Sequence, residues 1–364
     1  MEGINADTKL ESLTDQQRIE LAQKLRDEQT ANQPLISEVQ PIEVLLEEYA
    51  DNDGFIGKIK WLRDEGRFIG LRRAKGDGDC FYRAFAFAFI HKILLMNDRP
   101  LHHFVVKHVE GTLALLKQAG FDEEIYLDFY EPLRRLLARM HSTDPETQEL
   151  NDHALLEAIN DPETSNSIVV YLRLLTSAFL KVNADEYTPF LFALDGDVGS
   201  TSGGPPTMSD FCANQVEAIG KEADHVQITA LSRALKTSLD VAYLSRAQAP
   251  PDTPLSESLE GDSTLQQQQQ QQAQAHSQSQ QPPSATTATT QGQQGKEIPG
   301  DEAAQRRRLA EDPNRCDVVR FDVEDGQMLE IGTMLLRPGH YDLLVEAPAP
   351  ASPEIEIPPV ASGP

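Results

Sequence analysis

The chain has 364 residues and a formal net charge of −26, from 32 Lys or Arg and 58 Asp or Glu. This acidic excess argues against nucleic acid and anionic membranes as partners, because phosphate groups attract clusters of Lys and Arg. A basic protein surface fits better as a partner. The three cysteines, Cys80, Cys212 and Cys316, are too few and too widely spaced for a disulfide framework or a metal site, and we expect no cofactor.

The polar residues 1–41 are predicted to form an N-terminal extension. Its start lacks the basic region and apolar core of a signal peptide, and no apolar stretch in the chain is long enough to span a bilayer. We therefore expect a reducing compartment: the cytosol, the nucleus or both. An amphipathic helix predicted over residues 16–28 could dock on a partner, while a solvated arm is an equally good interpretation.

Apolar residues at helical spacing dominate the next part of the chain. They predict helices within residues 42–67, in several pieces between 101 and 181, and over 208–219 and 226–235. The apolar run from Ile168 to Leu180 contains one charged residue, Arg173.

Strand signals come only late in the chain, over residues 238–244, 317–323, 333–336 and 340–345. The last two runs flank Pro338-Gly339, a strong turn signal, and are predicted to form a hairpin. Helices followed by an antiparallel sheet indicate an α+β domain.

Two segments have compositions that cannot form a hydrophobic core. Residues 247–313 contain an unbroken glutamine run and many Ser, Thr and Pro residues, and residues 347–364 are rich in Pro and Ala. We interpret 247–313 as a disordered insertion that interrupts one domain spanning 42–346 and leaves it at a turn between two strands. Residues 347–364 are predicted to be a disordered tail.

The stretch from Lys75 to Phe85 holds the candidate nucleophile. Gly and Asp residues form a turn that ends in Cys80, and the nearly all-apolar segment from Phe81 to Met96 is predicted to be a buried helix. Cys80 would then lie on the first helical turn, where unpaired amides and the helix dipole favour a thiolate. Buried cysteines are usually inert packing residues, so the nucleophile hypothesis requires a suitable base elsewhere in the chain.

His340 is the histidine best placed to be that base. It begins a strand directly after the Pro-Gly turn, and Asp342 follows two residues later, so period-two geometry puts both side chains on one face, opposite Tyr341 and Leu343. A carboxylate beside an imidazole can accept its Nδ1 proton and stabilise the imidazolium. Taken alone, His340 and Asp342 also fit a polar hairpin tip. With Cys80 they form a candidate triad in the order expected of a papain-like thiol hydrolase.

The stretches Asp77–Phe85, Val169–Ser177 and Arg337–Asp342 resemble the motifs of the otubains, a family of ovarian-tumour-type (OTU) deubiquitinases. A looser match covers Lys221–Leu231. The resemblance extends over residues 42–245 and 316–346. It implies a papain-like OTU fold, in which a small, mostly antiparallel sheet packs between helical subdomains.

The resemblance also implies roles for individual residues. Cys80 would be the nucleophile, His340 the general base and Asp342 its orienting carboxylate. Asp77 would belong to the loop that shapes the oxyanion site, where amides at the helix start can face a developing negative charge. Otubains usually have asparagine just before the cysteine, whereas this chain has Asp79. A carboxylate there opposes thiolate formation unless it points to solvent.

Within the looser match, Asp224, His225 and Ile228 are candidate contacts for the substrate, although a helix cap is the competing interpretation for His225 beside Asp224. The resemblance implies ubiquitin and polyubiquitin chains as partners, and an isopeptidase that cleaves ubiquitin from chains or conjugates. Because otubains can also bind ubiquitin-conjugating enzymes without catalysis, a non-catalytic regulator is the alternative. A third hypothesis is a scaffold whose function lies in the glutamine-rich insertion.

Overall fold

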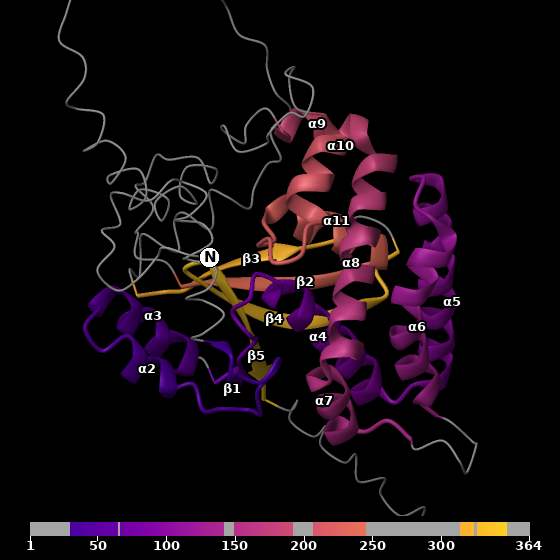
Figure 1. Ribbon diagram of the computed structural model, residues 1–364. Coiled ribbons are helices and arrows are strands. Elements are labelled where there is room, and N and C mark those ends of the chain that lie inside the picture. Colours follow the sequence, from indigo (N-terminus) through magenta and orange to yellow (C-terminus); the bar gives the residue numbers. More distant parts are fainter. Residues whose placement is uncertain are drawn as a thin grey trace, which may run out of the picture.

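The computed structural model describes residues 30–64, 66–141, 149–191, 207–244, 314–323 and 326–347. The helix expected over 16–28, the insertion at 247–313 and the tail beyond residue 347 lie outside these ranges. Figure 1 shows the helices arranged around one twisted sheet. No helix in the described ranges is both long and apolar enough to cross a membrane.

Helices form most of the described chain between residues 44 and 235, as the apolar spacing predicts. They are α2 (Val44–Glu48), α3 (Asp53–Asp64), α4 (Cys80–Met96), α5 (Arg99–Gln118), α6 (Glu123–Arg139), α7 (Asp152–Asn160), α8 (Pro162–Val182), α9 (Ala184–Leu191), α10 (Met208–Phe211), the π-helix η2 (Cys212–Val216) and α11 (His225–Leu235). The region expected to be helical before residue 67 is thus two separate helices, α2 and α3.

The sheet has five strands in the order β1-β5-β4-β2-β3. They are β1 (Phe68–Arg72), β2 (Thr237–Tyr243), β3 (Asp317–Phe321), β4 (Leu329–Arg337) and β5 (His340–Glu346). β4 and β5 form the predicted hairpin, in which Arg337 pairs with His340. β2 and β3 are also antiparallel neighbours, so the insertion connects the paired ends Tyr243 and Asp317.

A separate hydrophobic core covers each face of the sheet. On one face, α4, α5, α6, α7, α8 and α11 pack against alternate strand residues that include Tyr341 and Leu343. On the other face, α2 and α3 pack against the intervening residues, such as Leu335 and Leu344. Figure 1 shows α2 and α3 on the side of the sheet away from α8. The α+β architecture with a sheet between helical subdomains is confirmed.

α4 is the central helix of the larger core. Of its 17 residues, 12 are buried, because apolar side chains occur on all of its faces. It contacts both β4 and β5. This burial fixes the end of the helix that carries Cys80 beside the start of β5.

The structure differs from the sequence prediction in two strands. β1 was not predicted, because its five residues include Gly70 and do not alternate between polar and apolar. Gly70 is required there, since a Cβ would lie 2.4 Å from the carbonyl oxygen of Gln40. β2 pairs in parallel with β4, so the sheet is mixed rather than a simple meander.

Residues 30–41, assigned above to the N-terminal extension, pack on the domain. Ile36 and Gln40 form antiparallel bridges with Ala74 and Leu71, and Ile36 is buried. This part of the chain therefore runs beside β1 and the segment that leads to Cys80, upstream of the expected boundary at residue 42.

Candidate active site

Cys80 is the first residue of α4 and only 1% exposed. The loop before it is tight: Gly78 has φ +86°, and a Cβ on it would lie 2.0 Å from the carbonyl oxygen of Gly220. Only glycine fits this contact. The loop that follows η2 therefore packs directly against the nucleophile loop.

The sulfur of Cys80 accepts a hydrogen bond from the backbone amide of Tyr341, at 3.4 Å. The amide of Cys80 belongs to the first turn of α4, whose N–H groups have no intrahelical partner. Unpaired amides at a helix start can donate to a developing oxyanion. The sulfur and the amide thus lie at the same end of the same helix.

His340 and Asp342 lie on one face of β5, as period-two geometry predicts. His340 donates from Nε2 to Oδ1 of Asp342, at 2.8 Å. The sequence led us to expect this contact at Nδ1, and the structure corrects that expectation. With Nε2 facing the carboxylate, Nδ1 is the ring nitrogen left for the Cys80 thiol, with which His340 also interacts.

Asp342 is fully buried and has two further partners. Its Oδ1 accepts a hydrogen bond from the amide of Ala74, at 3.1 Å. Its Oδ2 forms an ion pair with Nε of Arg337, at 2.8 Å. Because Ala74 and Arg337 hold Asp342, the position of the carboxylate does not depend on His340.

The charges of this pair stabilise each other. Burial disfavours the charged ring, but hydrogen bonds with Asp342 and Cys80 outweigh it and raise the pKa of His340 to about 9. Burial would likewise raise the pKa of Asp342, yet the hydrogen bond from His340 and the charge of Arg337 hold it below its usual value. The arrangement therefore favours imidazolium beside carboxylate at neutral pH.

Asp77 shapes the loop before Cys80 and does not contact His340 in the interactions that the structure describes. Its Oδ1 accepts hydrogen bonds from the amide of Asp79, at 3.0 Å, and from Nη1 of the buried Arg83, at 2.9 Å. Asp77 therefore closes the turn directly before Cys80 and anchors it to α4. The geometry fits the loop-shaping role that the resemblance implies for Asp77.

Asp79 neither points to solvent nor stands alone. It is 5% exposed, and its Oδ1 is bound by Nε and Nη2 of Arg173, at 2.9 and 2.5 Å, and by the amide of Gly220, at 3.1 Å. Arg173 also donates to the carbonyl oxygens of Gly78, Val216 and Lys221. The charge of Asp79 is therefore balanced by Arg173, and the expected opposition to a thiolate is largely removed.

A model of the Peptidase C65 Otubain family matches residues 28–346. The chain belongs to the otubain family. It is 32% identical to human "Ubiquitin thioesterase OTUB1" over 248 residues, 68% of this chain and 82% of the relative. It is 34% identical to human "Ubiquitin thioesterase OTUB2" over 210 residues, 58% of this chain and 81% of that relative.

The fold is also that of solved otubain structures. A complex titled "The structure of h/ceOTUB1-ubiquitin aldehyde-UBC13~Ub" has a chain that superposes with a TM-score of 0.62 and 23% identity, covering 92% of this chain and 100% of that one. A second, titled "The structure of a ceOTUB1 ubiquitin aldehyde UBC13~Ub complex", gives 0.61 and 24%, covering 90% and 99%.

The candidate substrate contacts of this otubain fall into two groups. Asp224 and His225 are exposed at the start of α11, where Asp224 is the N-cap with a capping box. Ile228 is 1% exposed and packs in the larger core, so it does not present a surface to a substrate. Asp224 and His225 remain available to ubiquitin, and the cap predicted for this position is also present.

Two arginines near the site were not predicted as functional residues. Arg337 holds Asp342, and Arg173 holds Asp79. The sequence does contain a signal for Arg173, the one charged residue in a long apolar run, because a buried guanidinium requires a buried anion. The signal for Arg337 is only that it is the first residue of the Arg337–Asp342 motif, since charged residues are common next to a turn.

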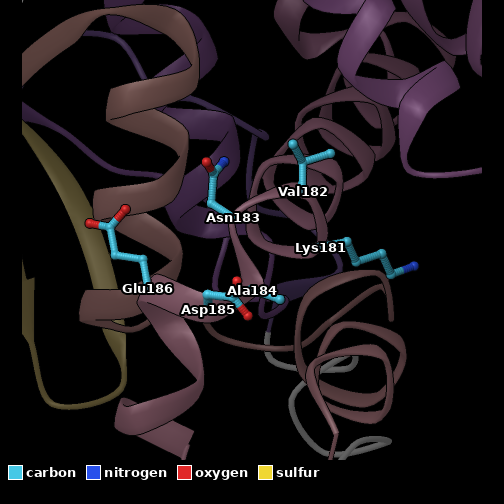
Figure 2. Close-up of a pocket in the computed structure, with 6 residues that line it drawn as sticks. All are labelled: Lys181, Val182, Asn183, Ala184, Asp185 and Glu186. Carbon is cyan, nitrogen blue, oxygen red and sulfur yellow. The ribbon is translucent and has the colours of Figure 1, made fainter.

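A pocket also lies at the junction of α8 and α9, where it is lined by residues 181–186. Figure 2 shows Lys181 and Glu186 pointing to opposite sides, so charged groups do not converge there. Lys181 is instead paired with Glu217, at 2.7 Å. The pocket contains neither a cysteine nor a histidine.

Proposed function

We propose that this otubain is a deubiquitinating cysteine peptidase that hydrolyses isopeptide bonds between ubiquitin and lysine. The observation that carries the proposal is the set of Cys80, His340 and Asp342, with Nε2 of His340 at 2.8 Å from the carboxylate and an amide donating to the sulfur. The names of its relatives, ubiquitin thioesterases, supply the substrate class.

The chemistry follows from the geometry. The Cys80 thiolate attacks the carbonyl carbon of the isopeptide bond, and the Cys80 amide stabilises the oxyanion. His340 protonates the lysine amine as the carbon–nitrogen bond breaks, leaving a thioester between Cys80 and ubiquitin. His340 then accepts a proton from the water that attacks the thioester carbon, and the carbon–sulfur bond breaks to release ubiquitin and restore the Cys80 thiolate beside the imidazolium.

Asp342 contributes by holding the ring through both proton transfers. It keeps Nε2 occupied, so that Nδ1 is the nitrogen that exchanges protons, and it stabilises the imidazolium. No metal or cofactor is needed for any of these steps.

Ubiquitin and polyubiquitin chains are the partners of this proposal, and the net charge of −26 favours partners with a basic face. Ubiquitin-conjugating enzymes are additional proposed partners, since the related structures are titled as complexes with UBC13~Ub and UBCH5B~Ub. A purely non-catalytic regulator is less favoured, because a binder has no use for the paired nucleophile, base and carboxylate. The cytosol or nucleus, where thiols stay reduced, is the proposed location.

The test is cleavage of purified ubiquitin dimers of every linkage by the full-length chain. We expect at least one linkage to be cleaved, and no cleavage by Cys80→Ala. Binding of the same dimers to both proteins is measured in parallel. Binding without cleavage of any linkage by the wild type would support the non-catalytic regulator instead.

A further inference from the structure

Asp342 is the end of a chain of alternating charges that reaches helix α2. Arg337, the last residue of β4, pairs with Oδ2 of Asp342 through Nε. Its Nη1 binds Oε1 of Glu48, the last residue of α2, and lies 3.4 Å from the Tyr49 hydroxyl. The other oxygen of Glu48 accepts from Nη2 of Arg73, at 2.8 Å.

We infer that Arg337 is a positioning residue that keeps Asp342 ionised and oriented throughout the reaction, and that Glu48 holds Arg337 in place. This inference rests on the proposed function for its catalytic meaning. It gives helix α2, which has no role in the mechanism above, a connection to the catalytic groups across the face of the sheet.

Asp342 is fully buried, so its charge depends on the groups around it. A buried carboxylate stays charged only when opposite charges and hydrogen bonds compensate for lost water. Its Oδ1 is satisfied by His340 and Ala74, and its Oδ2 faces Arg337. His340 alternates between imidazolium and imidazole during the reaction. Arg337 stays charged in both states, because a guanidinium does not deprotonate in proteins.

Arg337 is in turn compensated by α2. Its side chain is 9% exposed, and burial disfavours its charge. Asp342, Tyr49 and Glu48 together outweigh that effect and raise the pKa of Arg337 above its ordinary value. Glu48 is 37% exposed, so its carboxylate remains solvated while it fixes the guanidinium.

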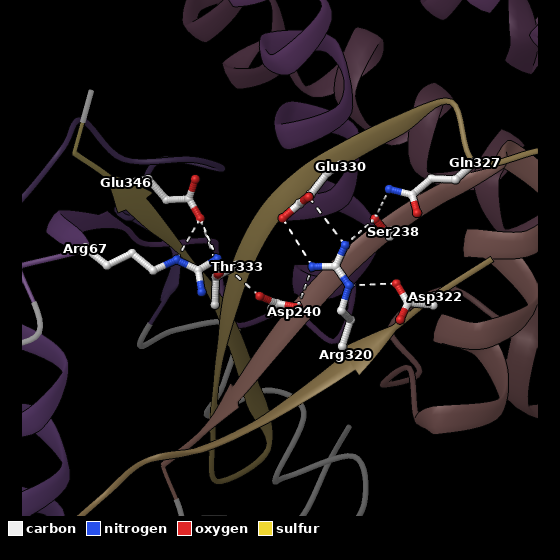
Figure 3. A network of polar contacts seen from close by, with 9 residues as sticks. All are labelled: Arg67, Ser238, Asp240, Arg320, Asp322, Gln327, Glu330, Thr333 and Glu346. Atoms are coloured by element: carbon white, nitrogen blue, oxygen red, sulfur yellow. Dashed lines mark hydrogen bonds and ion pairs between the residues drawn. The ribbon is translucent and has the colours of Figure 1, made fainter. Parts of the chain in front are cut away.

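The same face of the sheet offers a matched control. Arg320 on β3 pairs with Asp240, Asp322 and Glu330, and Figure 3 shows this network beside the one formed by Arg67. Arg320 is 40% exposed, and none of these contacts involves the triad. Arg320→Gln thus removes a sheet arginine with several ion pairs and leaves Asp342 untouched.

The experiment compares full-length wild type, Arg337→Gln, Arg337→Lys and Arg320→Gln, each checked for folding by circular dichroism. Two rates are measured between pH 5 and 9: alkylation of Cys80 by iodoacetamide, and cleavage of a ubiquitin dimer. In Arg337→Gln, Asp342 should be protonated at higher pH and its hold on the imidazolium lost. We expect the acidic limb of both profiles to move up by about one pH unit or more.

The other variants separate charge from geometry. Arg337→Lys keeps the positive charge but cannot contact Asp342 and Glu48 at the same time. The acidic limb of its pH–rate profiles should therefore stay near that of wild type, while the plateau rate falls a few-fold. Arg320→Gln should match wild type in both. An unmoved limb in folded Arg337→Gln, or an equal movement in Arg320→Gln, overturns the inference.

The test still decides if Arg337→Gln does not fold, or if no variant cleaves ubiquitin dimers. If Arg337→Gln does not fold, Glu48→Gln carries the test: it should lower the plateau a few-fold in a folded protein, and a wild-type plateau refutes the role of α2 and Arg337 together. If no variant cleaves ubiquitin dimers but the alkylation limb moves as expected, the proposed function fails and the assignment of Arg337 stands.

Discussion

Cys80 and Cys316 are equally buried, at 1% exposed each, but they belong to the cores on opposite faces of the sheet. The sulfur of Cys80 accepts a hydrogen bond from the Tyr341 amide and lies beside His340. The sulfur of Cys316 donates to the carbonyl oxygen of Tyr243, at 3.3 Å. The sulfur of Cys80 thus accepts from a donor, whereas the sulfur of Cys316 donates to an acceptor.

This difference has a direct electrostatic consequence. Burial raises the pKa of Cys316 to about 12, despite the nearby charge of Lys58. Cys212 resembles Cys316: it donates to the Ser177 carbonyl, and burial raises its pKa to about 11. Both of these thiols therefore stay protonated at neutral pH. The groups around the sulfur decide whether the thiol or the thiolate is stabilised.

The largest expected effect separates the three cysteines. A ubiquitin probe with a C-terminal electrophile should add once to wild type and not at all to Cys80→Ala, measured by intact mass. Cys212→Ala and Cys316→Ala are the controls and should each retain one adduct. Labelling that survives Cys80→Ala would show that another cysteine reacts, and would contradict the proposed difference between Cys80 and the other two.

The next effect concerns the groups that distinguish Cys80 from the other two cysteines. His340→Ala should abolish cleavage of ubiquitin dimers, and Asp342→Asn should reduce it by about 10²-fold or more, because the ring loses its anionic partner. Circular dichroism checks that both variants fold. A wild-type rate in Asp342→Asn would mean that another group orients His340.

The pH dependence follows from the same pair. His340 is protonated below its raised pKa of about 9, and it must be protonated to deliver a proton to the departing amine. Cleavage rates of wild type should therefore stay high above pH 7 and fall as pH rises through about 9. A fall centred near pH 6.5, the ordinary value for histidine, would contradict the contacts with Asp342 and Cys80.

A smaller effect is expected at Asp79. Asp79→Asn removes the anion that balances Arg173, so the uncompensated guanidinium should favour the nearby thiolate. Alkylation of Cys80 by a small neutral reagent at pH 7 should become a few-fold faster. Stability should fall, because a buried charge loses its partner. An unchanged dependence of the alkylation rate on pH would show that the Asp79 carboxylate has no electrostatic effect on the Cys80 sulfur.

The smallest effect is expected in the segment that precedes Cys316. Replacing residues 247–313 by a short linker should leave cleavage within a few-fold of wild type, because the paired ends of β2 and β3 already lie side by side. The entropy cost of closing a loop grows only with the logarithm of its length. The free energy of unfolding should therefore change by about a few kcal/mol at most. Loss of activity or precipitation would indicate that part of this segment packs on the domain.

Local sequence patterns predicted the reacting groups because their geometry depends on near neighbours. The length of the nearly all-apolar run after Cys80 favours a buried helix, and the Gly-Asp turn before it indicates where that helix starts. His340 and Asp342 share a face because side chains alternate along a strand. The same reasoning predicted the hairpin of β4 and β5, since Pro338-Gly339 determines where the chain turns.

Long-range pairing determined the rest. β1 is a strand because β5 lies beside it. β2 runs parallel to β4 because β3 and β4, which are consecutive in the chain, lie on opposite sides of β2. Asp79 and Arg173 are 94 residues apart, and Glu48 and Arg337 are 289 apart. No local spacing predicts such contacts, nor which ring nitrogen of His340 meets Asp342. Partners of buried charges are fixed only when packing excludes water and brings distant segments together.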